Sequence, residues 1–227
     1  MGNQKSTSPK TQPIPVENKQ LHQDSVVTIS ILLDESGSMG TTKSFTMESL
    51  NSFILKQKRL PLTSAAETKV SLTKFNTVVS SVFENVPLHN VPVITDKDYN
   101  PDGGTALFDA IGNIIGSVKH RGTDPVIVVI LTDGEENSSK EFSSSKIREL
   151  VKTMEEKGWT FVYLGANQDS FKNAQNIGIS SAQNFEQTQV GIEKMMDQVG
   201  ENMSSYRKAV KSSNSKPIFT LNKNLQS

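Results

Sequence analysis

Continuous apolar stretches alternate along this chain with stretches in which apolar residues recur every three or four positions. Residues 26–33 (VVTISILL), 126–132 (VIVVILT) and 160–165 (TFVYLG) are nearly continuous apolar runs. Such runs are typical of strands that are buried on both faces of a sheet. Residues 69–75 and 78–83 are two further strand-like runs, and the short polar break between them at Asn76 and Thr77 predicts a hairpin.

Helical spacing appears in the segments between these runs. The apolar stripes are formed by Met47, Leu50 and Ile54; by Leu107, Ile111, Ile114, Ile115 and Val118; by Ile147, Leu150, Val151 and Met154; and by Ile192, Met195, Met196, Val199, Met203, Tyr206 and Val210. Pro61 is expected to close the first helix and Gly158 the third. Strands that alternate with helices predict an α/β fold, with a mostly parallel central sheet, one antiparallel edge strand and helices on both faces.

The two ends of the chain lack this pattern. Residues 1–24 are rich in Pro, Gln, Ser and Lys without periodic apolar residues, which predicts a disordered arm. Residues 25–211 are expected to form one domain, followed by a tail over residues 212–227. The tail carries a short apolar patch at Ile218, Phe219 and Leu221, which is expected to pack back on the domain.

Composition excludes several classes of function. Lys and Arg together number 24, as do Asp and Glu, so the formal net charge of zero argues against a general nucleic-acid binder. The absence of cysteine excludes disulfides and thiolate chemistry. There is neither a membrane-spanning apolar stretch nor a secretory signal in the sequence. We therefore expect an intracellular protein, in the cytoplasm, at the periphery of a membrane or in a virus particle.

Oxygen-bearing residues follow the buried runs. DESGSM (34–39) follows the first run, TDGEEN (132–137) ends the second, and the turn PDGGT ends at Thr105. In sheets of this kind, ligands bind beyond the carboxyl ends of the strands, where the strand order reverses. The candidate set is Asp34, Ser36, Ser38, Thr105 and Asp133. It offers hard oxygen donors without nitrogen or sulfur, and thus suits Mg²⁺ or Mn²⁺ better than Zn²⁺ or Cu²⁺.

DESGSM matches the Asp-x-Ser-x-Ser motif of von Willebrand factor A (vWA) domains, and the chain resembles that family. The metal-ion-dependent adhesion site (MIDAS) of the family adds a threonine from a second loop and an aspartate from a third. GGTALFDA supplies Thr105 and LTDGEEN supplies Asp133, in the same order along the chain. The resemblance implies a Rossmann-like vWA fold in which Ser36, Ser38 and Thr105 bind the metal through hydroxyl oxygens. It implies that Asp34 and Asp133 act directly or through water, and it is nearest to compact intracellular members from bacteria, phages and large viruses.

Residues beside this set are assigned other roles. Glu35, Glu135 and Glu136 are expected to be solvated, and Thr105 is expected in an exposed loop. Asp109 lies four residues after Thr105, in the first turns of a helix, which favours a helix-dipole or hydrogen-bonding role over metal ligation. Gly103 and Gly104 are expected to allow the tight turn that presents Thr105.

The first residues carry a separate motif. MGNQKS fits the Met-Gly-x-x-x-Ser pattern of N-myristoylation, with Gly2 as the acceptor. One myristoyl chain binds membranes only marginally, with a constant of roughly 10⁴ M⁻¹. A second contact is therefore needed for stable attachment.

Together these features predict a Mg²⁺-dependent protein–protein interaction module for adhesion or scaffolding, without catalysis, that recognises an acidic side chain of a protein partner. Two alternatives stay open. One is a structural component of a viral particle or envelope, in which the metal only stabilises the fold. The other is a metal-dependent phosphatase or hydrolase, which needs a general base or nucleophile that the motifs do not supply.

Overall fold

The structure is a computed structural model of the chain. It describes residues 25–118, 124–166, 170–213, 217–219 and 221. The predicted arm over residues 1–24, with Gly2, lies outside the described residues, as do residues 214–216, 220 and 222–227 of the predicted tail.

A six-stranded sheet forms the centre of the domain, with the strand order β3-β2-β1-β4-β5-β6. The strands are β1 (Val27–Asp34), β2 (Thr68–Phe75), β3 (Val79–Pro87), β4 (Val126–Thr132), β5 (Trp159–Ala166) and β6 (Ser181–Phe185). Only the β2–β3 pair is antiparallel. The predicted α/β class, a mostly parallel sheet with one antiparallel edge strand, is therefore confirmed.

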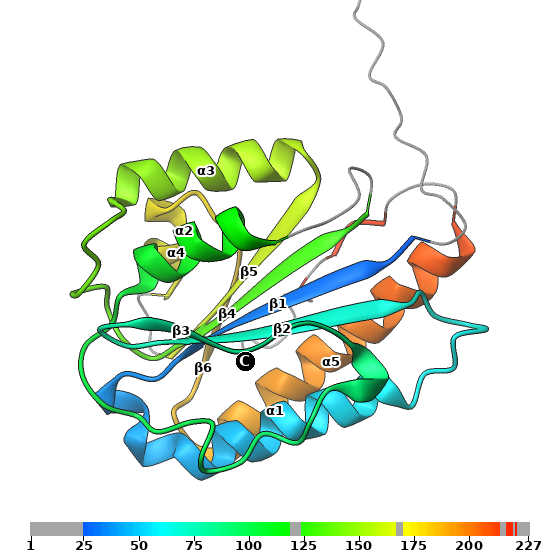
Figure 1. Cartoon of the computed structure of the whole chain (residues 1–227), viewed down its shortest axis with the longest axis horizontal. Coiled ribbons are helices and arrows are strands. Elements are labelled where there is room, and N and C mark those ends of the chain that lie inside the picture. The colour runs from blue at the N-terminus through cyan, green and yellow to red at the C-terminus, as the bar shows by residue number, and fades with distance from the viewer. Residues whose placement is uncertain (1–24, 119–123, 167–169, 214–216, 220, 222–227) are drawn as a thin grey trace, which may run out of the picture.

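Helices cover both faces of the sheet (Figure 1). Helices α1 (Lys43–Lys58) and α5 (Gln189–Ser212) pack on one face, and α2 (Leu107–Ser117), α3 (Ser144–Glu156) and α4 (Ser170–Asn176) pack on the other. Short 3-10 helices span Gly37–Thr42 and Leu88–Asn90. Each face has its own apolar core, because the alternating side chains of β1 and β4 point to opposite sides. Of the helices in the described ranges, none combines the length and apolarity needed to cross a membrane.

Most predicted elements are present. Strand β4 has the predicted bounds, β1 is shifted by one residue, and β5 is longer by one residue at each end. The hairpin forms as expected, and the Asn76 side chain stabilises its turn by accepting a hydrogen bond from the Val78 amide at 2.9 Å. Gly158 ends α3 with a φ of 92°, a conformation that glycine adopts without steric cost. Two elements, α4 and β6, are absent from the sequence-based prediction. The β6 sequence, SAQNF, buries only Phe185 and so shows no apolar alternation.

Two residues of the tail's apolar patch, Phe219 and Leu221, pack back on the domain as expected. Phe219 is only 5% exposed, and its ring meets that of Tyr206 on α5 edge-on, with 5.8 Å between the ring centroids. Ile218, by contrast, is 85% exposed.

A buried arginine joins α5 to the segment between α1 and β2. The Arg207 guanidinium donates to the carbonyl oxygen of Gln57 at 2.9 Å and to that of Ala66 at 3.2 Å. In return, the Ala66 amide donates to the Arg207 carbonyl at 3.0 Å. Burial lowers the pKa of Arg207 to about 10, so the side chain remains charged at neutral pH. The end of α5 is thereby fixed against the amino-terminal end of the sheet.

Candidate metal centre

The predicted oxygen ligands lie at the carboxyl ends of the two central strands. Asp34 is the last residue of β1, and Asp133 follows β4 directly. The two strands are parallel neighbours, with Leu33 opposite Leu131. The chain proceeds from β1 towards one edge of the sheet and from β4 towards the other, so this is the point where the strand order reverses.

The structure brings together all five residues of the candidate set. The Ser36 and Ser38 hydroxyl oxygens are 3.1 Å apart, and the Ser38 hydroxyl donates to Asp133 Oδ1 at 2.7 Å. The remaining oxygens converge on Gly134. A Cβ atom placed on that glycine would lie 3.0 Å from Thr105 Oγ1, 3.7 Å from Asp34 Oδ2 and 3.8 Å from Ser36 Oγ. A glycine here leaves room for these oxygens to face one point.

Asp34 is the buried anchor of this cluster, with 0% of its surface exposed. Its Oδ1 accepts the Ser36 amide at 2.7 Å, and its Oδ2 accepts the Thr132 hydroxyl at 2.5 Å. Burial raises the pKa of Asp34, and the hydrogen bonds from Thr132 and Ser36 oppose that rise. A cation beside this carboxylate would favour its charged form.

Asp133 is half-buried on the open side of the cluster. Burial raises its pKa, while hydrogen bonds from Ser38 and Gln187 act in the opposite direction. The Gln187 side-chain amide, from the loop between β6 and α5, donates to Asp133 Oδ2. Sequence reasoning missed Gln187, since this loop is distant in sequence from the other motifs and follows a strand without an apolar pattern.

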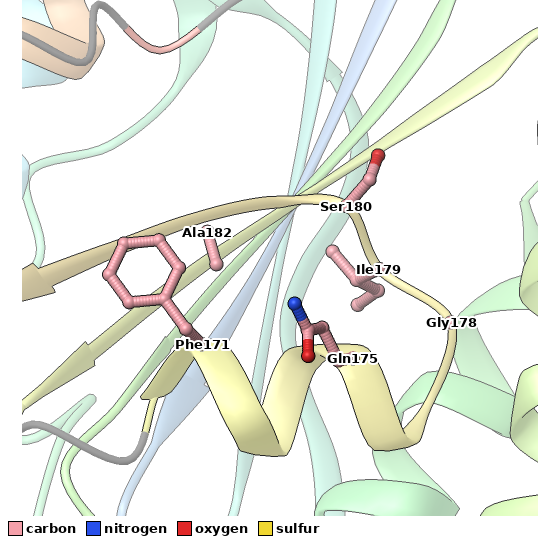
Figure 2. A pocket seen from close by; sticks show the side chains of 6 residues that line it. All are labelled: Phe171, Gln175, Gly178, Ile179, Ser180 and Ala182. Carbon is pink, nitrogen blue, oxygen red and sulfur yellow. The ribbon is translucent and has the colours of Figure 1, made fainter.

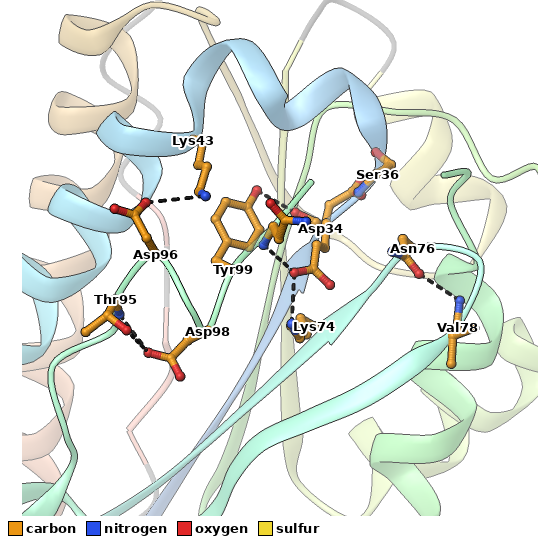
Figure 3. Close-up of polar contacts among 12 residues, drawn as sticks. Asp34, Ser36, Lys43, Lys74, Asn76, Val78, Thr95, Asp96, Asp98 and Tyr99 are labelled. Atoms are coloured by element: carbon orange, nitrogen blue, oxygen red, sulfur yellow. Dashed lines mark hydrogen bonds and ion pairs between the residues drawn. The ribbon is translucent and has the colours of Figure 1, made fainter. Parts of the chain in front are cut away.

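Glu35, expected to be solvated, is instead 6% exposed and holds the second loop in place. Its Oε1 accepts the Asn100 amide at 2.6 Å and pairs with Lys74 Nζ at 2.9 Å. Figure 3 shows Tyr99 beside Asp34, where the tyrosine hydroxyl donates to the Asp34 carbonyl at 2.7 Å. These contacts fasten the segment that leads to Thr105 against the DESGSM loop.

Thr105 itself is only 2% exposed, so its expected place in an exposed loop is wrong. Its backbone is bonded to the third loop: its amide donates to Asn137 Oδ1 at 2.8 Å, and its carbonyl accepts the Asn137 amide at 3.0 Å. Gly103 has a φ of 76°, as the expected tight turn requires. A Cβ on Gly104 would lie 2.2 Å from the Ser138 hydroxyl, which shows how closely the two loops approach.

Glu136, expected to be solvated, is instead half-buried, and its carboxylate accepts hydrogen bonds from several backbone amides. It accepts the Phe108 amide at the start of α2 at 2.9 Å and the Ser139 amide at 2.8 Å. Glu135 is exposed, as predicted. Asp109 accepts the amides of Lys140 and Phe142 at 2.8 and 3.0 Å, which agrees with the expected hydrogen-bonding role.

The chemistry of this donor set fits a hard divalent cation. It consists of three hydroxyls and two carboxylates, whose oxygens are ligands typical of Mg²⁺. Within the described residues, no group of three or more His, Asp or Glu side chains is arranged to hold a metal. A site at these five residues would therefore depend on its hydroxyl oxygens.

The surface near Asp133 is hollowed only slightly. A cavity of about 100 Å³ lies against Asp133 and Gly134 and extends to Tyr163 and Asn173. A larger one, of about 250 Å³, lies between α4 and β6 (Figure 2). It is lined by Phe171, Gln175, Gly178, Ile179, Ser180 and Ala182, none of which belongs to the oxygen cluster.

Comparison with known proteins identifies the family. The family model described as "von Willebrand factor type A domain" matches residues 28–198, which is most of the chain. The chain belongs to this family. The match extends from β1 into α5, so the vWA domain includes the strands and loops that form the oxygen cluster. No curated protein matches the chain in sequence.

Solved structures similar to this vWA domain include adhesive and structural proteins. One is proximal thread matrix protein 1 from the mussel byssus with a zinc-occupied MIDAS motif, at 17% identity and a TM-score of 0.58, covering 80% of this chain and 46% of that one. Another is the pilus adhesin SpaC from Lactobacillus rhamnosus GG, at 13% identity and a TM-score of 0.66, covering 83% and 31%. The chain thus spans less than half the length of these proteins, and at such identities the likeness concerns the fold alone.

We expect Glu136→Ala to lower the free energy of unfolding by about 2 kcal/mol, because backbone amides would lose a charged acceptor. Glu135→Ala is the matched control, since Glu135 is the adjacent acidic residue and is exposed. Urea denaturation followed by circular dichroism measures both variants. Equal stability of the two variants would contradict the role assigned to Glu136.

Proposed function

We propose that this vWA domain binds Mg²⁺ or Mn²⁺ at Asp34, Ser36, Ser38, Thr105 and Asp133 and thereby recognises an acidic side chain of a protein partner. The convergence of these oxygens at the carboxyl ends of β1 and β4 carries the proposal. Members of this fold include adhesive proteins, which supports a role in protein–protein interaction. The bound ion would supply a positive centre with an exchangeable position.

The existing hydrogen bonds leave the hydroxyl oxygens free to coordinate. A hydroxyl has one hydrogen to donate and two lone pairs to offer. Ser38 uses its hydrogen on Asp133 Oδ1, so its lone pairs remain directed elsewhere. Thr132 uses its hydrogen on Asp34 Oδ2, which holds that carboxylate in position without adding charge. The set is thus preorganised for a cation.

The open side of the cluster is where a partner would approach. Ser38 is exposed and Asp133 is half-buried, whereas Asp34, Ser36 and Thr105 are buried behind them. Gln187 is exposed and covers one oxygen of Asp133. A partner carboxylate arriving on this side would compete with the Gln187 side chain for the space next to Asp133.

We propose binding without catalysis, and this is supported by the lack of a histidine beside the cluster among the described residues. His89 is the one histidine in the described part of the chain, and it lies in the 3-10 helix after β3. That helix is at the amino-terminal end of β2, since Pro87 pairs with Lys69, and thus at the opposite end of the sheet. Histidine is the side chain that most often acts as general base, and the described histidine is too far from the cluster to do so.

Mg²⁺ is expected to raise the melting temperature, because a ligand that binds only the folded state stabilises it by mass action. At a hundredfold excess over the dissociation constant the gain is about 2.7 kcal/mol. Asp133→Ala should abolish this gain, while Glu135→Ala should keep it. Differential scanning calorimetry in Mg²⁺ and in EDTA provides the measurement, and identical curves for the unmutated protein would refute the metal site.

Recognition of an acidic side chain can be tested with immobilised peptides that carry either Asp or Asn at one position. We expect the domain to be retained on Asp peptides in Mg²⁺ and to be lost in EDTA, because only a carboxylate adds a charge-assisted bond to the ion. Thr105→Ala should remove retention, whereas Thr105→Ser keeps the hydroxyl and should preserve it. Equal retention on Asp and Asn peptides would contradict metal-mediated recognition.

We also propose that Gly2 is myristoylated and tethers the domain to a membrane, as the sequence MGNQKS suggests. Co-expression with a eukaryotic N-myristoyltransferase should add one myristoyl mass to the intact protein, and Gly2→Ala should prevent this addition. An intact mass that shows only a retained Met1 or an acetyl group would refute the lipid tether.

A further inference from the structure

The two aspartates of the candidate metal centre are held by different kinds of contact. The Asp34 carboxylate is fully buried and is bonded to a backbone amide and to a hydroxyl on β4. Asp133 is half-buried, and its Oδ1 accepts the hydroxyl of Ser38, which is itself a candidate ligand. Its Oδ2 accepts the side-chain amide of Gln187. Among the described residues, Gln187 is thus the one side chain outside the candidate set that bonds to the Asp133 carboxylate.

The two oxygens of Asp133 face different segments of the chain. Oδ1 is on the side of the cluster, since the Ser38 hydroxyl that it accepts at 2.7 Å lies 3.1 Å from the Ser36 hydroxyl. Oδ2 is bonded to the loop between β6 and α5. The terminal torsion of an aspartate is broad, so a carboxylate that is bonded through one oxygen can turn about that torsion. With both oxygens bonded, the Asp133 carboxylate is fixed with Oδ1 towards the hydroxyls.

The loop that carries Gln187 is itself firmly placed. Phe185, the last residue of β6, is only 7% exposed. The Thr188 hydroxyl caps α5 by accepting the Gly191 amide at 3.1 Å. A Cβ atom placed on Gly191 would lie 2.3 Å from the Glu186 carbonyl oxygen, so the loop turns closely over the first turn of the helix. The backbone on both sides of Gln187 is therefore anchored, and its side chain extends from a fixed point.

The chemistry of the Gln187 side chain suits a role in orienting Asp133. An amide group donates through its N–H without carrying a charge. It can therefore hold the Asp133 carboxylate without compensating the negative charge that attracts a cation, as a lysine or arginine side chain would do. Side chains that hydrogen-bond to a metal ligand fix its orientation, and their removal typically lowers metal affinity about ten- to hundredfold.

We propose that Gln187 is a positioning residue of the metal centre, which holds the Asp133 carboxylate in the orientation that binds a divalent cation. This inference rests on the proposed function, because it requires a metal at the five candidate residues. Gln187 also occupies space on the side where a partner would approach, so its effects on the metal and on the partner must be measured separately. The test therefore uses the metal alone.

Isothermal titration calorimetry of the full chain with Mg²⁺ should show that Gln187→Ala raises the dissociation constant about tenfold or more. Gln189→Ala is the matched control, because Gln189 is an exposed glutamine two residues later whose side chain donates to Glu193 at 2.9 Å. This control should leave the dissociation constant unchanged. Circular dichroism in EDTA should show that both variants are folded.

A spectroscopic measurement separates the orientation of Asp133 from a general effect on the loop. The side-chain NH₂ signals of Gln187 in a proton–nitrogen correlation spectrum are identified by their loss in Gln187→Ala. In EDTA, Asp133→Ala should shift these signals, because the carboxylate that accepts the amide is removed. The side-chain signals of Gln189 should stay in place.

The outcomes distinguish this inference from the proposed function. If the unmutated protein binds Mg²⁺ and Gln187→Ala binds it equally well or more tightly, the positioning role is overturned while the metal site stands. An equal loss of affinity in Gln189→Ala, or unchanged Gln187 signals in Asp133→Ala, would overturn the positioning role as well. If the unmutated protein does not bind Mg²⁺, the proposed function fails and the positioning role fails with it.

Discussion

The arrangement of the loops at the carboxyl ends of the strands depends on one fully buried carboxylate, that of Asp34, the last residue of β1. Asp34 is 0% exposed, and a carboxylate in that position is stable only when both of its oxygens are bonded. One oxygen is bonded within its own loop, to the Ser36 amide, and the other across the sheet, to the Thr132 hydroxyl. The first contact turns the chain so that the DESGSM loop folds over the strand end. The second holds the ends of β1 and β4 together, which fixes the distance between Asp34 and Asp133.

The other loops are positioned mainly through backbone groups, and this explains how a polar site can be rigid without a network of ion pairs. The Gly37 amide donates to the Gly103 carbonyl at 3.0 Å, and the Asp102 amide donates to the Glu35 carbonyl at 2.8 Å. The Thr105 carbonyl accepts the amides of the third loop. Such bonds persist when a side chain changes, so substitution of a hydroxyl can alter the site without releasing the loop. Glu35 and Glu136 differ, because here the side chains themselves hold the loops. The Glu35 carboxylate accepts the Asn100 amide and pairs with Lys74, and the Glu136 carboxylate accepts the amides of Phe108, Ser138 and Ser139.

The sequence predicts the helices and strands whose apolar residues form a continuous run or recur at regular spacing. Buried parallel strands are apolar along their whole length, and VVTISILL and VIVVILT therefore mark β1 and β4 clearly. The five candidate ligands are also predictable, because each follows a buried strand or lies beside a glycine turn. Strand β6 is different: it lies at the edge of the sheet, and its side chains are mostly half-buried, so polar residues are tolerated there. The burial of Glu35, Glu136 and Thr105 depends on contacts between loops that are distant in sequence. Gln187 is unpredictable for the same reason.

Helices α1 and α5 connect the two ends of the domain. Both begin beside the candidate metal centre and end at the amino-terminal end of the sheet, since each follows a parallel strand. They are joined along their length: the Gln57 side chain donates to the Gly200 carbonyl at 2.8 Å, and Arg207 returns a bond to the Gln57 carbonyl. A contact at one end therefore acts on a rigid pair of helices. Because Gln187 immediately precedes the Thr188 cap of α5, a displacement of this side chain from Asp133 would be felt first at the start of that helix. The opposite end of α5 is held by the buried Arg207, which donates to the Ala66 carbonyl, and by the packing of Phe219 against Tyr206. The start of the helix, next to Gln187, is therefore the part that the candidate metal centre can influence most directly.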